Sequence, residues 1–276
     1  MRYEHIQSYQ NDYVKDGRQE IGYNAPLPAL NVLYHLNESW NLYANTEGSF
    51  STVQYSQIGK AVSSGSIEPE KARTWELGTR FDNQALQAEV GLFLINFSNQ
   101  YEPNQTDDSV TSRGKTRHSG LESRLRYDLG DVSPALEKLS VSASYAYVNA
   151  VIRQAGDNYG NQVPFSPKHK GTLGMDYLSG SWTFNVNSEY QSGQYADNAN
   201  TQDESADGSL GRIPGFMLWG ARASYDFGPQ FANLNLGVGV KNIFDHHYFT
   251  RAAEDNNKGL YAGQPRTIYM QGSVKF

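Results

Sequence analysis

The residues of this chain that are able to do chemistry form no recognisable catalytic or metal-binding motif. Six histidines are present, and none has the spacing of a zinc site. Neighbouring side chains on an extended chain point to opposite sides, so His246 and His247 make a poor chelating pair. A serine–histidine esterase stays open as an alternative, but there is no Gly-x-Ser-x-Gly elbow, and His118 is weak support.

Two acidic segments resemble ion-binding loops only superficially. Asp255-Asn-Asn-Lys-Gly259 lacks the acidic spacing and the closing glutamate of a calcium loop. Asp203, Glu204 and Asp207 are better explained as a solvated loop surface, and nothing supports a calcium role for them. We therefore expect no catalytic residue, no metal ligand and no cofactor, and a protein that is not an enzyme.

The composition narrows the class of protein. The 276 residues include no cysteine, which excludes a disulfide framework and a thiolate metal site. The net charge of −6 argues against a general nucleic-acid binder. No run of about 18 apolar residues exists, so no membrane-spanning helix is expected. A chain with 19 tyrosines, 26 glycines and only 38% hydrophobic residues is then a soluble β domain or an outer-membrane β-barrel.

Apolar and polar residues alternate along most of the chain, which is typical of strands that separate two environments. Near the C-terminus, for example, Ile268 and Met270 lie on one face and Tyr269 and Gln271 on the other. The pattern predicts twelve strands, at residues 1–10, 28–36, 40–51, 73–82, 86–101, 114–129, 138–153, 168–178, 181–191, 213–227, 234–244 and 265–276.

The connections between these strands are sorted by length. Short turns at 37–39, 83–85, 130–137, 179–180 and 228–233 alternate with long polar loops at 11–27, 52–72, 102–113, 154–167, 192–212 and 245–264. Outer-membrane barrels have this layout, with short periplasmic turns and long extracellular loops. A soluble sandwich has no reason to sort its loops, so the sequence favours a transmembrane antiparallel up-and-down barrel.

Charged residues share one face of several expected strands: Arg80, Glu122, Arg124, Arg126, Asp128, Arg222 and Lys275. A charge facing lipid near the midplane costs about 2–4 kcal/mol, so these side chains must face the lumen. We expect them to pair with one another across neighbouring strands, with direct substrate contact as the alternative.

Two further features are expected at the membrane surface. Tryptophans near strand ends would form an interfacial girdle; they are Trp40, Trp75, Trp182 and Trp219. Arg113, Lys115 and Arg117 alternate and would place three positive charges on one face of a strand end. Either they contact anionic head groups such as lipopolysaccharide phosphates, or they form an exposed basic edge, and a bulge would change which way they face.

The C-terminal stretch resembles the closing strands of TonB-dependent outer-membrane receptors. The likeness is carried by Gly239-Val-Lys-Asn-Ile-Phe-Asp245, by Tyr261-Ala-Gly-Gln-Pro-Arg-Thr-Ile-Tyr269 and by the terminal Phe276. Upstream, Glu68-Pro-Glu-Lys-Ala-Arg-Thr-Trp-Glu-Leu-Gly78 is similar to a mid-barrel strand of the same family. In this family the Asn-Ile-Phe-Asp turn shapes a strand end.

Four more stretches resemble one subfamily, the ferric dicitrate receptors: Asn24-Ala-Pro-Leu-Pro-Ala-Leu-Asn-Val-Leu-Tyr34, Trp40-Asn-Leu-Tyr-Ala-Asn-Thr-Glu-Gly48, Phe165-Ser-Pro-Lys-His-Lys-Gly-Thr-Leu-Gly174 and Asp255-Asn-Asn-Lys-Gly259. Such receptors have a 22-stranded barrel, a plug and a TonB box. The resemblance therefore implies that 1–276 is the C-terminal portion of a barrel whose plug is absent. With no signal peptide in Met1–Gln7, a truncated reading frame is expected.

The resemblance also implies a ligand and partners. Ferric dicitrate would be the imported cargo rather than a cofactor, with TonB, outer-membrane lipid and lipopolysaccharide as partners in a Gram-negative outer membrane. The one expected ligand residue is Gln105, whose amide can donate to citrate oxygens without the desolvation of a charge. A solvated glutamine is the alternative, and Pro103 would stiffen its approach. Loops at about 52–72 and 102–117 resemble the moving lids. The competing function is a complete twelve-stranded passive pore.

Overall fold

The main element of the computed structural model, which describes residues 2–12, 17–52, 68–103, 110–206, 208–252 and 260–274, is one antiparallel sheet. Eleven strands form it in the order β17-β14-β13-β10-β9-β8-β7-β6-β5-β4-β3. Their bounds are β3 Ala29–His35, β4 Trp40–Ser51, β5 Glu70–Asp82, β6 Leu86–Pro103, β7 Val110–Asp128, β8 Leu139–Ile152, β9 His169–Ser179, β10 Trp182–Gln191, β13 Phe216–Asp226, β14 Asn235–Lys241 and β17 Thr267–Ser273. The predicted all-β architecture is confirmed.

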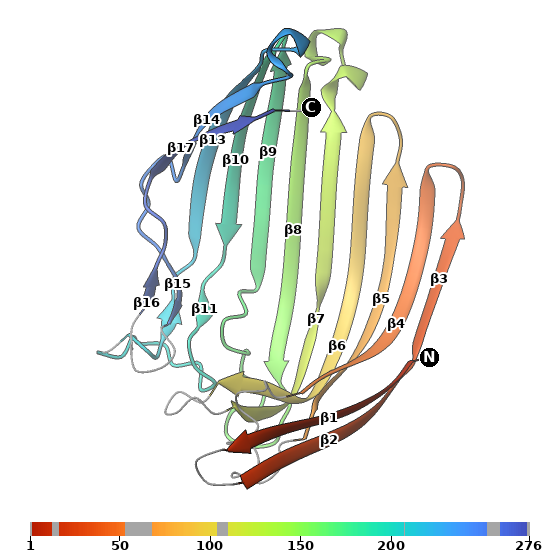
Figure 1. Ribbon diagram of the computed structural model, residues 1–276, viewed down its shortest axis with the longest axis vertical. Helices are drawn as coiled ribbons and strands as arrows, with labels where there is room; N and C mark the ends of the chain where they lie inside the picture. The colour runs from red at the N-terminus through yellow and green to blue at the C-terminus, as the bar shows by residue number, and fades with distance from the viewer. Residues whose placement is uncertain are drawn as a thin grey trace.

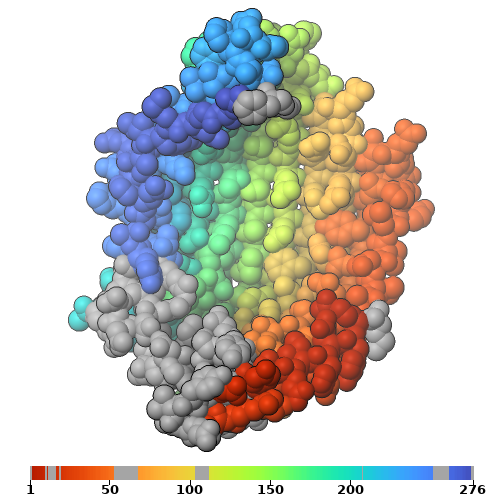
Figure 2. Space-filling model, in the orientation of Figure 1, coloured from red at the N-terminus to blue at the C-terminus, as the bar shows by residue number. Residues whose placement is uncertain are grey.

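Apart from residues 11–27, which are mostly strand, the predicted sorting of the connections by length is confirmed where the structure describes them. Figure 1 shows the short turns together at one end of the sheet and the long loops at the other. Three short 3₁₀ helices lie in the turns: η2 (Leu129–Asp131), η3 (Pro134–Leu136) and η4 (Pro229–Phe231). No helix in the described part of the chain is long and apolar enough to cross a membrane. Figure 2 shows the sheet hollowed between its two edges.

The two faces of the sheet differ in chemistry because side chains alternate along each strand. One set of positions faces the hollow and is rich in charged, amide and glycine residues. The other set faces outward and is apolar: Leu77, Leu92 and Leu173 are 59%, 51% and 56% exposed. A soluble domain would cover so continuous an apolar face.

The segment 1–27 differs from its prediction. The expected first barrel strand, 1–10, is β1 (Arg2–Asp12), and it pairs with β2 (Gly17–Leu27), which was expected to be loop. The two make a separate hairpin at the long-loop end (Figure 1). The strand signal in β2 is the alternation of Ile21, Ala25 and Leu27, which are buried, but the polar composition of 11–27 suggested a loop.

A closed twelve-stranded barrel would pair strand 1–10 with strand 265–276. Instead β1 pairs with β2 and β17 pairs with β14. Among the described residues the sheet therefore stays open at β3 and β17. The pairing required by the passive-pore alternative is not present in this part of the chain.

The tryptophan prediction is wrong for Trp75. Trp40 and Trp182 are the first residues of β4 and β10, and Trp219 lies near the start of β13. Trp75 lies in the interior of β5, paired with Thr46 and Leu94. It faces outward beside leucines, and Arg73 lies 5.8 Å from the centre of its ring, so its place within the strand is what differs from the prediction.

The buried core lies under the long loops rather than within the sheet. Loop 154–167 folds over the inner face of β8, where Ala150 and Ile152 pack against Val163. A second cluster joins Ala196 and Ile213 to Phe165. Two short hairpins continue the loop layer, β11 (Gln194–Tyr195) with β12 (Arg212–Ile213) and β15 (Phe249–Ala252) with β16 (Leu260–Ala262). The long loops at this end are thus anchored by packing.

Candidate functional site

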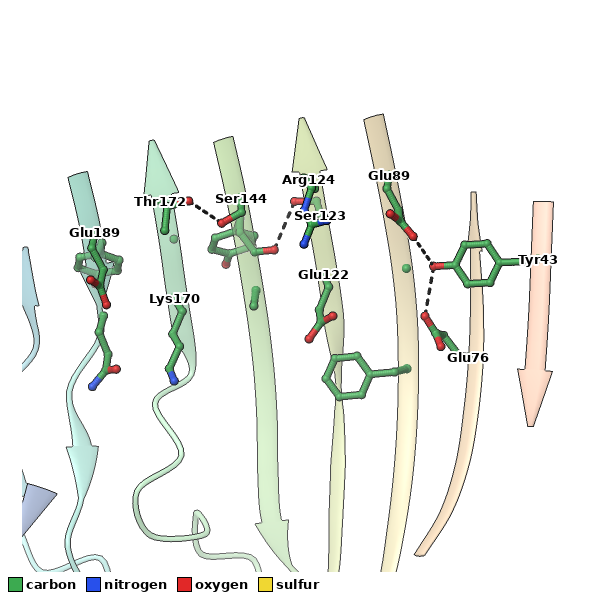
Figure 3. A pocket seen from close by; sticks show the side chains of 17 residues that line it. Tyr43, Glu76, Glu89, Glu122, Ser123, Arg124, Ser144, Lys170, Thr172 and Glu189 are labelled. Carbon is green, nitrogen blue, oxygen red and sulfur yellow. Dashed lines mark hydrogen bonds between the residues drawn. The ribbon is translucent and has the colours of Figure 1, made fainter. Parts of the chain in front are cut away.

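The inner face of the sheet contains a polar hollow of about 510 Å³, shown in Figure 3. Small residues at inward positions open it, because Gly91 and Ala146 leave the strand surface bare between longer neighbours. The polar side chains that border it come from seven consecutive sheet strands, β4 to β10: Tyr43, Glu76, Glu89, Glu122, Arg124, Ser144, Lys170, Thr172 and Glu189.

Strand register places these side chains in two rows across the wall. Glu89, Arg124, Ser144, Thr172 and Glu189 are successive partners from β6 to β10. The second row lies two residues nearer the long loops and contains Gly91, Glu122, Ala146, Lys170 and Gln191. The expectation that these charges face inward is confirmed for Glu122 and Arg124, which point into the hollow (Figure 3).

Part of this wall is an ion-pair and hydrogen-bond network. Arg80 Nη2 lies 2.9 Å from Glu89 Oε1 on the neighbouring strand. Tyr43 donates from its hydroxyl to Glu76 Oε1 at 3.2 Å and to Glu89 Oε1 at 3.4 Å. Asn45 donates to the other oxygen of Glu76 at 2.8 Å. Arg80 thus pairs across neighbouring strands, but with Glu89, which was not among the charges expected to pair with one another.

The centre of the wall is different. Glu122, Arg124, Lys170 and Glu189 have no side-chain hydrogen bond or ion pair with any other described residue. Glu122 and Lys170 share one row but are separated by Ala146, about two strand spacings apart. Four glutamates and two basic residues line the hollow, so an incoming anion would meet a net negative surface. The geometry fits a solvated wall better than an anion-binding site.

A second polar centre lies at the long-loop end, where β6 and β7 extend past the rest of the sheet. Arg113 Nη2 is 2.7 Å from Glu102 Oε2, and their side chains are only 12% and 20% exposed. Arg113 also donates from Nε to Asn198 Oδ1 at 2.7 Å, and Asn198 donates back to Glu102 at 2.8 Å. This closed triangle ties the β6–β7 extension to loop 192–212.

Further hydrogen bonds join that loop to loop 154–167. Gln162 donates its backbone N–H to Asn200 Oδ1 at 2.7 Å, and Asn200 Nδ2 donates to Gln162 O at 2.8 Å. Asn161 donates to Asn198 O at 3.0 Å. Asp197 accepts from Thr201 Oγ1 at 3.1 Å. The described loops therefore form one connected polar layer above the hollow.

A tyrosine pair secures the β1–β2 hairpin to the same layer. Tyr101 donates its hydroxyl to Glu68 O at 2.9 Å, and its N–H to Glu70 Oε2 at 2.7 Å. The Tyr23 hydroxyl is hydrogen-bonded to Tyr101. Burial, followed by the negative charge of Glu68, raises the pKa of Tyr23 above its usual value of 10.0.

The predicted basic edge needs correction at Arg113. The register of β6 and β7 shifts between Phe97 and Gln100, where Asn99 and Gly114 have φ of 56° and 80°. This bulge separates Arg113 from Lys115 and Arg117. Arg113 forms an ion pair with Glu102 instead. Lys115 and Arg117 stay exposed on the outward face.

The other predicted residues have mixed outcomes. Three of the predicted features lie wholly or mostly outside the described residues: Gln105, the expected lid 52–72 and Asp255-Asn-Asn-Lys-Gly259. His118 contacts Thr116 Oγ1 at 3.3 Å, and no serine hydroxyl bonds to a histidine ring nitrogen among the described residues. No group of three metal-ligating side chains occurs in that part of the chain either.

Sequence reasoning missed Glu102 and Asn198, although both bond to Arg113 in a half-buried contact of the loop layer. Both lie in stretches that look like ordinary solvated loop. Their partner Arg113 was noticed, but only as one member of an alternating basic run. Nothing in a single sequence shows that residues 85 positions apart meet.

A family model described as "TonB dependent receptor-like, beta-barrel" matches residues 1–243. The chain belongs to this family. TonB-dependent receptors are outer-membrane proteins of Gram-negative bacteria, so the outward apolar face is the lipid-facing surface and the hollow lies on the lumen side. The family consists of receptors and transporters of siderophores and metals.

The chain is similar to several members over most of its length. The solved structure of the ferric citrate transporter FecA in the unliganded form is 73% identical, with a TM-score of 0.90, covering 99% of this chain and 42% of that one. The metal-pseudopaline receptor CntO of Pseudomonas aeruginosa is 25% identical, over 96% of this chain and 36% of the relative. The catecholate siderophore receptor Fiu of Escherichia coli K12 is 26% identical, over 89% and 32%. The chain thus spans less than half the length of these relatives.

Proposed function

We propose that this chain is the ligand-contacting barrel portion of a receptor that imports ferric citrate in a TonB-dependent manner. Ligand binding would be followed by closure of extracellular loops, and the cargo would be iron held by citrate. No bond is made or broken in such a step, so the chain needs only to bind and release.

The observation that carries this proposal is the likeness to FecA. The chain is 73% identical to FecA over 99% of its length. It is only 25% and 26% identical to CntO and Fiu, which are named as receptors for other metal chelates. Specificity in a receptor depends on the loops and inner wall, which vary faster than the lipid-facing face. Identity this high over a span that includes these loops supports the same class of ligand.

Gln105 remains our proposed ligand contact. It lies in the connection between Pro103 and Val110, whose two ends are fixed by strands β6 and β7. A neutral amide suits a citrate oxygen because it donates without carrying the desolvation cost of a charge. The carboxylates of the inner wall are poor candidates for the same role, since they would repel the anion.

A chimaera tests the function, since the chain spans 42% of the FecA chain. In this FecA chimaera, residues 1–276 replace the matching segment of FecA. The chimaera is expressed in cells that lack other ferric citrate receptors, and uptake of radioactive iron supplied as ferric citrate is measured. We expect iron uptake that requires TonB. An excess of ferric catecholate should not reduce this uptake. A chimaera that assembles in the outer membrane but binds no ferric citrate would contradict the proposal.

Gln105→Ala in the FecA chimaera tests the residue. We expect weaker ferric citrate binding, by about 0.5–1.5 kcal/mol for one lost hydrogen bond, measured by tryptophan fluorescence. Gln84→Ala is the matched control, because Gln84 is an exposed glutamine in a short turn at the opposite end. Equal affinities for the two variants would remove Gln105 from the site.

A further inference from the structure

Five basic residues gather on the outward face of β5 to β8 at the long-loop end. Strand register puts Arg73, Asn96 and Arg117 in one row across three neighbouring strands. Lys71 and Lys115 lie two residues nearer the loops on the same strands as Arg73 and Arg117. Arg153 follows β8, and its N–H donates to Lys115 O at 2.7 Å. We name Lys71, Arg73, Lys115, Arg117 and Arg153 the outward basic cluster.

The facing of this cluster follows from strand parity. Trp75 and Leu77 continue the same side of β5 below Arg73, and Leu121 and Leu125 continue that of β7 below Arg117. These are members of the lipid-facing apolar face. Neighbouring strands are about 4.8 Å apart and alternate residues about 7 Å, so each charge lies within about 10 Å of its nearest neighbour in the cluster.

The positive charges are not neutralised within the described chain. None of the five residues forms an ion pair with another described residue. Arg117 donates to Asn96 Oδ1 at 3.0 Å and Arg73 to Pro28 O at 3.1 Å, which hold both guanidinium groups in place. Arg153 lies 5.7 Å from the centre of the Tyr159 ring. The outward positions of β4 to β8 at this level include no carboxylate among the residues described.

The location selects the partner. The long loops mark the extracellular side, so the cluster borders the outer leaflet directly above the apolar face. That leaflet consists of lipopolysaccharide, whose lipid A carries phosphates next to its acyl chains. A ligand that contacts both surfaces must have an anionic head group and an apolar part below it. A free phosphate has no apolar part, and an acidic protein does not enter the bilayer, so both fit less well than lipid A.

We propose that the outward basic cluster binds the phosphates of lipid A while the leucines below it contact the acyl chains. Arginine forks and lysine ammonium groups both suit phosphate oxygens. This proposal concerns the lipid-facing surface and is independent of the imported ligand. Arg113, which pairs with Glu102 on the other side of the bulge, is not part of it.

Binding of bisphosphorylated lipid A to the detergent-solubilised FecA chimaera tests this, followed by native mass spectrometry. Each basic residue near an anionic surface contributes about 1 kcal/mol, so K115Q/R117Q/R153Q should weaken binding on the order of a hundredfold. The control K138Q/K168Q/K241Q removes three exposed lysines elsewhere and should change binding by less than about twofold.

Two further arms make the outcome decisive. Lipid A without phosphates should bind the parent and K115Q/R117Q/R153Q equally well, whereas an equal loss for both lipids would show that phosphate is not recognised. Assembly of each variant is checked by the heat-dependent gel mobility of the folded barrel. Correctly assembled K115Q/R117Q/R153Q with unchanged affinity for bisphosphorylated lipid A would overturn the proposal.

Discussion

The ring of Tyr43 occupies the space that a side chain at Gly78 would need. The two residues are direct cross-strand partners on β4 and β5, and a Cβ added to Gly78 would come within 2.3 Å of Tyr43 Cζ. Lying flat over the glycine, the tyrosine reaches two carboxylates, Glu76 and Glu89. Tyr269 covers Gly239 in the same way on β14 and β17.

Gly78→Ala should therefore destabilise the barrel by about 1–3 kcal/mol, the usual cost of overpacking. The ring would have to lift, and its hydroxyl would lose Glu76 and Glu89. Urea unfolding of the FecA chimaera measures the effect. Gly171→Ala is the control, because a Cβ there meets its nearest atom at an ordinary 3.4 Å.

A double-mutant cycle separates packing from glycine propensity. If the clash with the ring is the cause, Gly78→Ala should cost much less in a Tyr43→Ala background than in the parent, giving a coupling within about 0.5–3 kcal/mol. Additive losses would show that the ring and the glycine act independently.

Arg113→Leu should be far more damaging than Arg80→Leu. Arg113 and Glu102 are 12% and 20% exposed, and losing the arginine leaves a largely buried carboxylate, which costs about 3–5 kcal/mol. The Arg80–Glu89 pair has an arginine that is 59% exposed, and such pairs contribute about 0–1 kcal/mol. Unfolding in urea compares the two, and similar losses would argue against a buried network at the loop base.

The strands were predictable because a barrel strand separates lipid from water at every second residue. This alternation located all eleven sheet strands to within about four residues at each end, as for β4 at 40–51. It missed β2, and it located β1 without showing that β1 pairs with β2 outside the main sheet. Partner choice is a long-range property, and periodicity carries no information on it.

The site was less predictable for a related reason. Inward charges such as Glu122 follow from parity, yet whether they find partners depends on register across several strands. Glu89 meets Arg80, while Glu122 and Lys170 are kept apart by Ala146. The buried triangle at Arg113 depends on a bulge and on a distant loop. The alternating basic residues were therefore assigned to one surface, whereas Arg113 lies apart from Lys115 and Arg117.

Asn242 holds the Asn-Ile-Phe-Asp turn through its side chain. It is 5% exposed and has φ of 50°. Its Nδ2 donates to His246 O at 2.9 Å and Gln264 O at 3.1 Å, and its Oδ1 accepts from His246 N at 2.8 Å. Asn242→Ala should cost about 2–4 kcal/mol, because it leaves buried backbone groups unpaired and strains an alanine at positive φ.

Asn242→Gly distinguishes these two contributions. Glycine accepts the positive φ without strain but makes none of the three hydrogen bonds. We expect it to recover about 1 kcal/mol relative to Asn242→Ala in urea unfolding of the FecA chimaera. If glycine restored full stability, the side-chain hydrogen bonds would contribute nothing, contrary to the geometry.

Tyr23 should make attachment of the β1–β2 hairpin sensitive to high pH. Its pKa is raised by burial and by Glu68, so the folded state favours the neutral phenol. The stabilising contribution is complete below the unfolded value of about 10 and is lost as pH rises through the folded value. The ultraviolet difference between parent and Tyr23→Phe reports the titration, and Glu68→Gln should shift it downward without abolishing the elevation, because burial is the larger cause. A Tyr23 that titrates at or below its ordinary pKa would show that the hairpin does not pack as described.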